Sequence, residues 1–242
     1  MSKDDEAIMS NFTDLITSRA SLLTCYEMDS EQVSAFIERV ISVERNVPSN
    51  AFPDFVGELM DVEVFNISSS KETGKGSLFF KEKCAFDKRK SEALMRSVDS
   101  EDNKKGKSFV GTLEYTDHSY EFYISSLQRN IKNHKESLIK NNLYGKECTF
   151  IANYTQTVLS YVDENGVDQW YKLGVDSRAL RTILDELKGL VDYFILFNPT
   201  NSEAELIPIN MISSYLDKHT FNYEFYPRKN AGMICIAFSE QL

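Results

Sequence analysis

The chain has 242 residues, of which 42% are hydrophobic and 26% charged, and it contains only 10 Gly and 5 Pro. These proportions are typical of a globular protein and exclude collagen-like, low-complexity and wholly disordered chains. The 27 Lys and Arg against 37 Asp and Glu give a formal net charge of −10. A uniformly basic coat for nucleic acid is therefore excluded, whereas a local basic face is not.

The N-terminal region predicts a helical hairpin. Residues 6–26 carry apolar side chains at spacings of mostly three and four, which is typical of an amphipathic helix. A second helix begins after Asp29, whose side chain can cap it while Gln32 reaches back, as in a capping box. We expect residues 1–50 to form this hairpin, with an acidic outer face, and residues 51–242 to form a second domain.

The rest of the chain alternates between strand-like and helix-like patterns. Expected strands lie at 59–67, 108–115, 119–124, 148–154, 158–162, 169–173, 191–198, 205–209, 222–226 and 232–238. Expected helices lie at 77–98, 127–141, 178–190 and 210–216, and residues 99–107 form a polar loop. Because helices and strands are interleaved without a strict period, we expect an α+β or α/β fold: a mixed β-sheet flanked by helices.

Three of these strands carry particular information. The turn Asp163–Gly166 joins two of the apolar segments and ends in the glycine that a tight hairpin needs. Residues 191–198 read VDYFILFN, which is a nearly continuous apolar run. Such a run is typical of a strand in the middle of a sheet that is covered on both faces.

The cysteine spacing and the N-terminal residues indicate the cellular compartment in which we expect the protein. The four cysteines form no local pair, so structural zinc of the usual kind is not expected, and we interpret them as small buried hydrophobic residues: Cys25, Cys84, Cys148 and Cys235. The first residues are acidic and polar, unlike a secretory signal, and no apolar stretch approaches the roughly 18 residues of a membrane span. We therefore expect a cytoplasmic protein that does not contact membranes.

The segment KETGKGS at 71–77 has the composition of a phosphate-binding loop but not its spacing. A Walker A loop requires Ser or Thr directly after the Gly-Lys pair, whereas Lys75 is followed by Gly76. We expect a turn that ends in a helix cap.

A metal-dependent nuclease of the restriction-endonuclease type is one alternative. It needs an acid on one strand and Asp or Glu, any residue, then Lys on the next, so that carboxylates hold Mg²⁺ and the Lys orients water. The candidate acids are Glu114, Asp117 and Glu121, but Tyr123 stands where the Lys should follow Glu121. The chain resembles a restriction-endonuclease-like core only in its coarse order of elements. Apart from Mg²⁺ under this alternative, we expect no cofactor and no metal site.

The three histidines offer no local ligand motif. His118, His134 and His219 lie far apart in the sequence, and His134 falls at the apolar phase of the helix at 127–141. We therefore interpret His134 as a half-buried core histidine, and no recognisable motif favours an enzyme.

Charge is distributed unevenly along the chain. Residues 71–147 carry a net charge of +4, whereas the two flanking regions together carry −14. The basic residues on the two predicted central helices include Lys81, Lys83, Lys88, Arg89, Lys90, Arg129, Lys132 and Lys135. If the helices pack side by side, these residues form a surface that can neutralise phosphates or another anionic partner. Alternatively, the acidic hairpin covers them, within one chain or across a dimer.

These observations predict a cytosolic, non-catalytic interaction protein with a protein partner or a second copy of itself. Through its basic central surface it is expected to contact nucleic acid, as a subunit of a prokaryotic or phage defence-type assembly would. Two alternatives stay open. One is the divergent metal-dependent nuclease, and the other is an acidic inhibitor or immunity-type protein that presents the carboxylates of residues 1–63 to a basic partner.

Overall fold

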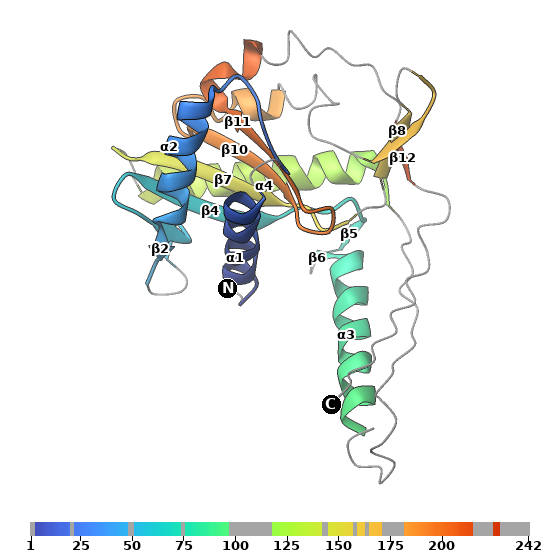
Figure 1. Ribbon diagram of the computed structural model, residues 1–242. Helices are drawn as coiled ribbons and strands as arrows, with labels where there is room; N and C mark the ends of the chain where they lie inside the picture. The colour runs from blue at the N-terminus through green and yellow to red at the C-terminus, as the bar shows by residue number, and fades with distance from the viewer. Residues whose placement is uncertain are drawn as a thin grey trace.

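A seven-stranded mixed β-sheet lies at the centre of the protein, as its computed structural model shows (Figure 1). The structure describes residues 3–19, 22–47, 51–73, 76–96, 118–141, 145–156, 159–162, 165–170, 182–214 and 225–227. Helices cover both faces of this sheet, so the predicted α+β class with a mixed sheet is confirmed.

The sheet has its parallel strands in the middle. Its spatial order is β1 (Leu23–Cys25), β11 (Glu203–Pro208), β10 (Tyr193–Asn198), β7 (Glu147–Asn153), β4 (Met60–Asn66), β3 (Phe55–Val56) and β2 (Glu44–Arg45). Strands β4, β7 and β10 run parallel to one another, while β3 and β11 run antiparallel to them on either side. This confirms the prediction that the apolar run 191–198 is a central strand, and the strand predicted at 148–154 forms β7 beside it.

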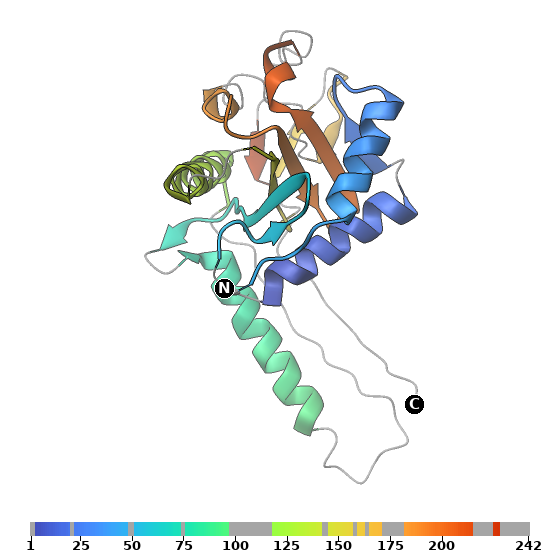
Figure 2. The same ribbon diagram turned by 90° about the vertical axis from the view of Figure 1, so that its left-hand side faces the viewer.

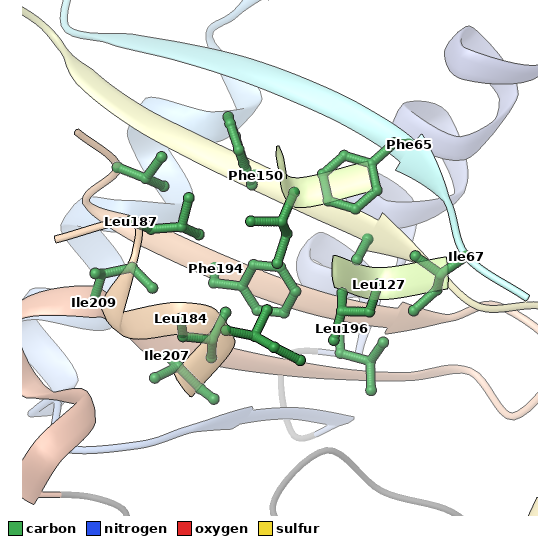
Figure 3. Packing of buried hydrophobic residues seen from close by; sticks show 14 of the residues in the cluster. Phe65, Ile67, Leu127, Phe150, Leu184, Leu187, Phe194, Leu196, Ile207 and Ile209 are labelled. Atoms are coloured by element: carbon green, nitrogen blue, oxygen red, sulfur yellow. The ribbon is translucent and has the colours of Figure 1, made fainter. Parts of the chain in front are cut away.

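Two hydrophobic cores lie on opposite faces of the sheet. Helix α4 (Tyr120–Asn141) and the helical residues 182–185 cover one face, where Phe150 and Phe194 contact neighbouring aliphatic side chains (Figure 3). Helices α1 (Lys3–Ser18) and α2 (Ser30–Ile41) cover the other face (Figure 2). Side chains of β4 point alternately to the two faces of the sheet, so this strand contributes to both cores. Met60, Val62 and Val64 face α1 and α2, while Phe65 faces α4.

The N-terminal helices flank a strand of the main sheet. The predicted helix at 6–26 ends at Ser18, because residues 23–25 pair in parallel with β11 instead of continuing the helix. Helix α2 has the predicted capping box: Asp29 Oδ1 accepts the Gln32 N–H at 2.9 Å, and Gln32 Oε1 accepts the Asp29 N–H at 2.9 Å. The buried residues of both helices belong to the same hydrophobic core as those of β4 and β10.

The centre of the chain forms two long helices. Helix α3 (Leu78–Arg96) was predicted, and the short hairpin of β5 (Glu72–Thr73) and β6 (Gly76–Ser77) precedes it. Ser77 Oγ accepts the Phe80 N–H at 3.3 Å, which is the predicted cap. The prediction of a strand at 119–124 is wrong, since these residues form the first turns of α4, with Tyr123 and Leu127 buried one helical turn apart. The predicted loop at 99–107 and strand at 108–115 lie outside the described residues.

A small second sheet contains the predicted hairpin. Strands β8 (Leu159–Val162) and β9 (Asp168–Trp170) pair antiparallel, and Gly166 has a φ of 75° in their turn. Strand β12 (Phe225–Pro227) pairs with β8, and the 3-10 helix η3 (Ile209–Met211) follows β11. The predicted strand at 232–238 lies outside the described residues.

None of the described helices is long and apolar enough to cross a membrane.

Candidate functional site

The two helices that carry the basic residues point in different directions. Helix α4 lies against the sheet, whereas α3 leaves the sheet at its N-terminal end and projects away from it (Figures 1 and 2). The condition that the two helices pack side by side is therefore not met along their length. The connection between them lies near the start of α3, where Arg129 of α4 forms an ion pair with Glu72 of β5, the strand before β6 and α3.

Helix α3 carries basic residues around two buried phenylalanine side chains. Phe79 and Phe86, two turns apart, are 3% and 2% exposed, whereas Lys81, Lys83, Lys88 and Arg89 are exposed and Lys90 is half-buried. Over its 19 residues the helix carries six Lys or Arg against three Asp or Glu. Lys88 Nζ lies 4.0 Å from Glu92, which is a solvent-exposed pair of little energetic weight.

The basic residues of α4 are engaged to different degrees. Arg129 contacts Glu72, and Lys135 Nζ lies 3.5 Å from Glu186. Lys132, between them, is exposed.

The acidic helices do not cover α4 within the chain. Helices α1 and α2 pack on the face of the sheet opposite to α4 (Figure 2). Of their acids, Glu6 forms an ion pair with Arg45, which follows α2 in the same region of the fold. The basic residues of α4 are thus separated from the acidic helices by the sheet.

The candidate nuclease acids are not brought together among the described residues. Glu121 lies in the first turn of α4, exposed, on a helix instead of the expected strand. Glu114 and Asp117 lie outside the described residues.

A buried cluster that the sequence analysis missed contains two carboxylates and an imidazole. Asp54 precedes β3 and Glu63 lies in β4, and the two side chains are 5% and 4% exposed. Glu63 Oε2 accepts the Asp54 N–H at 3.0 Å, and Asp54 Oδ2 accepts the Val64 N–H at 3.0 Å. Glu63 Oε1 lies 2.6 Å from His134 Nδ1, and the His134 ring stacks on Phe65 with 4.7 Å between centroids. His134 is therefore the half-buried core histidine that was predicted, with a carboxylate partner.

Burial dominates the electrostatics of this cluster. Burial, together with the negative charges of Glu63 and Asp5, raises the pKa of Asp54 from 3.8 to about 7, although the Val64 N–H and His134 act in the opposite direction. Burial also raises the pKa of Asp61, two residues before Glu63, against the attraction of Lys146, whose Nζ lies 3.8 Å away. Asp54 is thus a carboxyl group that gains a proton close to neutral pH.

The spacing of these acids can be read from the sequence, but their burial could not be predicted from it. Asp54, Asp61 and Glu63 lie within a hairpin in which acids alternate with Val and Met. Acids at alternate positions of a strand normally indicate a face in water. Only the packing of α4 and β7 beside β4, both distant in sequence, buries that face.

A second buried polar network lies beyond the carboxyl ends of β4 and β7. Ser69 is fully buried, and its Oγ lies 2.8 Å from His118 Nδ1 and 2.8 Å from Gln156 Oε1. Tyr154 donates its hydroxyl to Ser69 Oγ at 3.1 Å, and Gln156 Nε2 donates to Ser68 Oγ at 2.7 Å. Because these groups satisfy one another away from solvent, the network fixes the loop that leads from β4 to α3.

Burial makes two of the cysteines poor nucleophiles. Burial raises the pKa of Cys25 to about 11 and that of Cys148 to about 12, so both stay protonated. Cys84 is exposed on α3, so its expected burial is wrong. Within the described part of the chain, no group of three or more His, Cys, Asp or Glu residues is arranged to hold a metal ion.

No family model matches the chain, and neither a curated protein nor a solved structure matches it.

Proposed function

We propose that the protein is a non-catalytic interaction protein that binds nucleic acid through α3 and the middle of α4. The observation that carries this proposal is the projection of α3 from the sheet with four exposed basic side chains. A helix of 19 residues is roughly 28 Å long, which allows its Lys and Arg to reach several phosphates of one duplex. Arg129 and Lys132 of α4 extend the same positive region from the base of α3.

The acidic remainder of the chain supports a specific role for this region. With a net charge of −10, most of the surface repels a polyanion, so contact is confined to the basic residues. A protein that touches nucleic acid over so small a region suits a subunit of a larger cytoplasmic assembly, of the defence type or another, with a protein partner or a second copy supplying the remaining contacts.

Charge reversal tests this proposal. The variant K88E/R89E/K90E should lose binding to a labelled 20-base-pair DNA duplex or a single strand, measured by fluorescence anisotropy at low salt. The matched control is R19E/K140E/K188E, which makes the same change in net charge at exposed positions off α3. Equal loss in both variants would show a general charge effect, and no binding by the wild-type protein would refute the proposal. Capture of a basic protein instead, weakened by reversing acids of α1, would favour the inhibitor alternative.

The nuclease alternative is favoured by one observation, the position of Asp54 and Glu63. An acid before one strand of a hairpin and acids on the next strand follow the order that such a nuclease requires, although Phe65 stands where the Lys would be. Two carboxylates whose oxygens already accept hydrogen bonds, with no third ligand among the described residues, do not make a complete Mg²⁺ site.

The nuclease alternative has a direct test. Cleavage of DNA or RNA with Mg²⁺ or Mn²⁺ that disappears in D54N and E63Q, but persists in E121Q, would support it. Absence of cleavage by the wild-type protein with either metal would remove it.

A further inference from the structure

A cleft of about 720 Å³ lies at the amino ends of β7 and β10, away from α3 and from the buried clusters. Its lining includes Gln32, Ala35 and Arg39 of helix α2 and, from the end of β11 and the residues that follow it, Pro208 and Met211. Its volume falls within the usual range for small-molecule sites. Gly145 and Gly189, both with positive φ, lie in its lining, and a methyl group added at either would meet no atom within 4 Å. The cleft is therefore open at these two turns.

Carboxylates outnumber the cations that face this cleft. Its charged lining consists of Glu27, Glu147, Asp192, Arg39 and Lys146. Lys146 is directed elsewhere, since its Nζ donates to the Gly57 carbonyl at 2.8 Å and lies 3.8 Å from Asp61. Among the described lining residues this leaves the Arg39 guanidinium as the cation that faces Glu147 and Asp192.

Arg39 neutralises only one of these carboxylates. Its Nε lies 2.9 Å from Glu147 Oε2, and its Nη2 donates to the Tyr193 hydroxyl at 3.4 Å. Asp192 is exposed, and its orientation is fixed because Oδ2 accepts the Cys148 N–H at 2.8 Å. Burial and the charge of Asp192 raise the pKa of Glu147 in spite of Arg39. A second cation beside Asp192 and Glu147 would relieve the repulsion between them.

The lining also has an apolar part beside the acids. Met28 and Met211 lie in it together with Ala35 and Val191. Methionine side chains adapt to the shape of a bound group, and an aliphatic chain of a few carbons would contact them without leaving polar groups unpaired. The ring of Tyr193 adds a face to which a cation is attracted.

We propose that this cleft binds an alkylammonium cation, with the ammonium between Asp192 and Glu147 and the aliphatic chain against Met28 and Met211. The same chemistry occurs in a free diamine and in the lysine side chain of a peptide. Neutral and anionic ligands of equal size are disfavoured, because Arg39 balances only Glu147 and such ligands leave Asp192 without a counter-charge.

Binding of three probes tests the assignment and separates its two sources. Isothermal titration at low salt would use 1,5-diaminopentane, Nα-acetyl-lysine methylamide and, as the neutral comparison, 1-pentanol. We expect saturable binding of at least one cation and none of the alcohol. Tighter binding of the diamine would identify a free amine as the ligand, and tighter binding of the lysine derivative would identify a peptide side chain.

Isosteric variants locate the site. D192N keeps an oxygen for the Cys148 N–H and E147Q keeps one for Arg39, so both should fold, which circular dichroism would verify. Each should weaken cation binding about tenfold or more. E136Q, at an exposed position on α4, should leave the affinity unchanged. Failure of both cations to bind at millimolar concentration, or equal affinities in D192N and the wild-type protein, would overturn the proposal.

Discussion

Asp54 shows how a single buried carboxyl makes stability depend on pH. Its pKa in the folded protein is about 7, against an ordinary value of 3.8, because burial and nearby acids disfavour the charged form. The folded state therefore binds this proton more tightly than the unfolded state. It follows that the contribution of Asp54 to the free energy of unfolding falls as the pH rises from about 4 to 7 and then becomes constant.

Replacing this carboxyl by its neutral analogue should remove the dependence. Asn at position 54 keeps an oxygen for the Val64 N–H but carries no charge, so we expect D54N to be more stable than the wild-type protein at pH 8, by about 1–2 kcal/mol, and similar at pH 4. Urea denaturation at the two pH values measures this. A variant destabilised equally at both would show that the charged carboxylate is the form that the fold requires.

The Ser69 hydroxyl should stabilise the fold, because its removal leaves buried polar groups without a hydrogen-bond partner. Removing it in S69A deprives His118, Tyr154 and Gln156 of a buried partner, which we expect to cost about 1–3 kcal/mol. S125A, at an exposed position of α4, is the control and should change the free energy of unfolding by less than about 0.5 kcal/mol. Chemical denaturation distinguishes the two, and equal stability of S69A and wild type would mean that the network is not needed.

At the scale of the elements, the capping box of α2 gives a clear local prediction. Asp29 is exposed, so its replacement affects the cap without disturbing the core. D29A should destabilise the protein by about 1 kcal/mol, whereas D29S, which retains a capping oxygen, should lose much less. Thermal unfolding of both variants provides the comparison, and identical melting temperatures for D29A and wild type would contradict it.

Elements governed by local patterns were predictable, and those governed by distant partners were not. The cap at Asp29, the apolar run of β10 and the β8–β9 hairpin each carry their own signal in the sequence. Strand β1 does not, because its three residues continue an amphipathic pattern and become a strand only through pairing with β11. The start of α4 was misread since Tyr120, Phe122 and Ile124 alternate with polar residues, although the burial of Tyr123 and Leu127 follows a helical spacing.

The same distinction applies to the candidate sites. The basic residues of α3 could be predicted because the net charge of a segment can be counted from the sequence. That their side chains are exposed is seen only in the folded structure. The Asp54–Glu63–His134 cluster and the amino-end cleft both join residues from distant segments, and no local spacing contains that information.

At the scale of the whole molecule, α1 and α2 pack on the main sheet, so we expect them to unfold together with it. Phe12 and Phe36 are fully buried against the same sheet face as Val62 and Ile195. A chain of residues 51–242 would expose this face, so we expect it to lack a cooperative thermal transition followed by circular dichroism. A truncated chain that melts cooperatively, near the temperature of the full chain, would instead establish the two-domain division at residue 50.

The central claim is that the protein contacts nucleic acid phosphates through α3, and the salt dependence of binding tests it most directly. Association constants for one DNA duplex would be measured between about 50 and 200 mM salt, for the wild-type protein and for K88E/R89E/K90E. Each phosphate contact adds about 0.9 to the slope of log K against log salt, so the wild-type slope should be steep and the variant slope smaller by about 2–3. A wild-type protein that does not bind at about 50 mM salt, or equal slopes for the two proteins, would contradict this account.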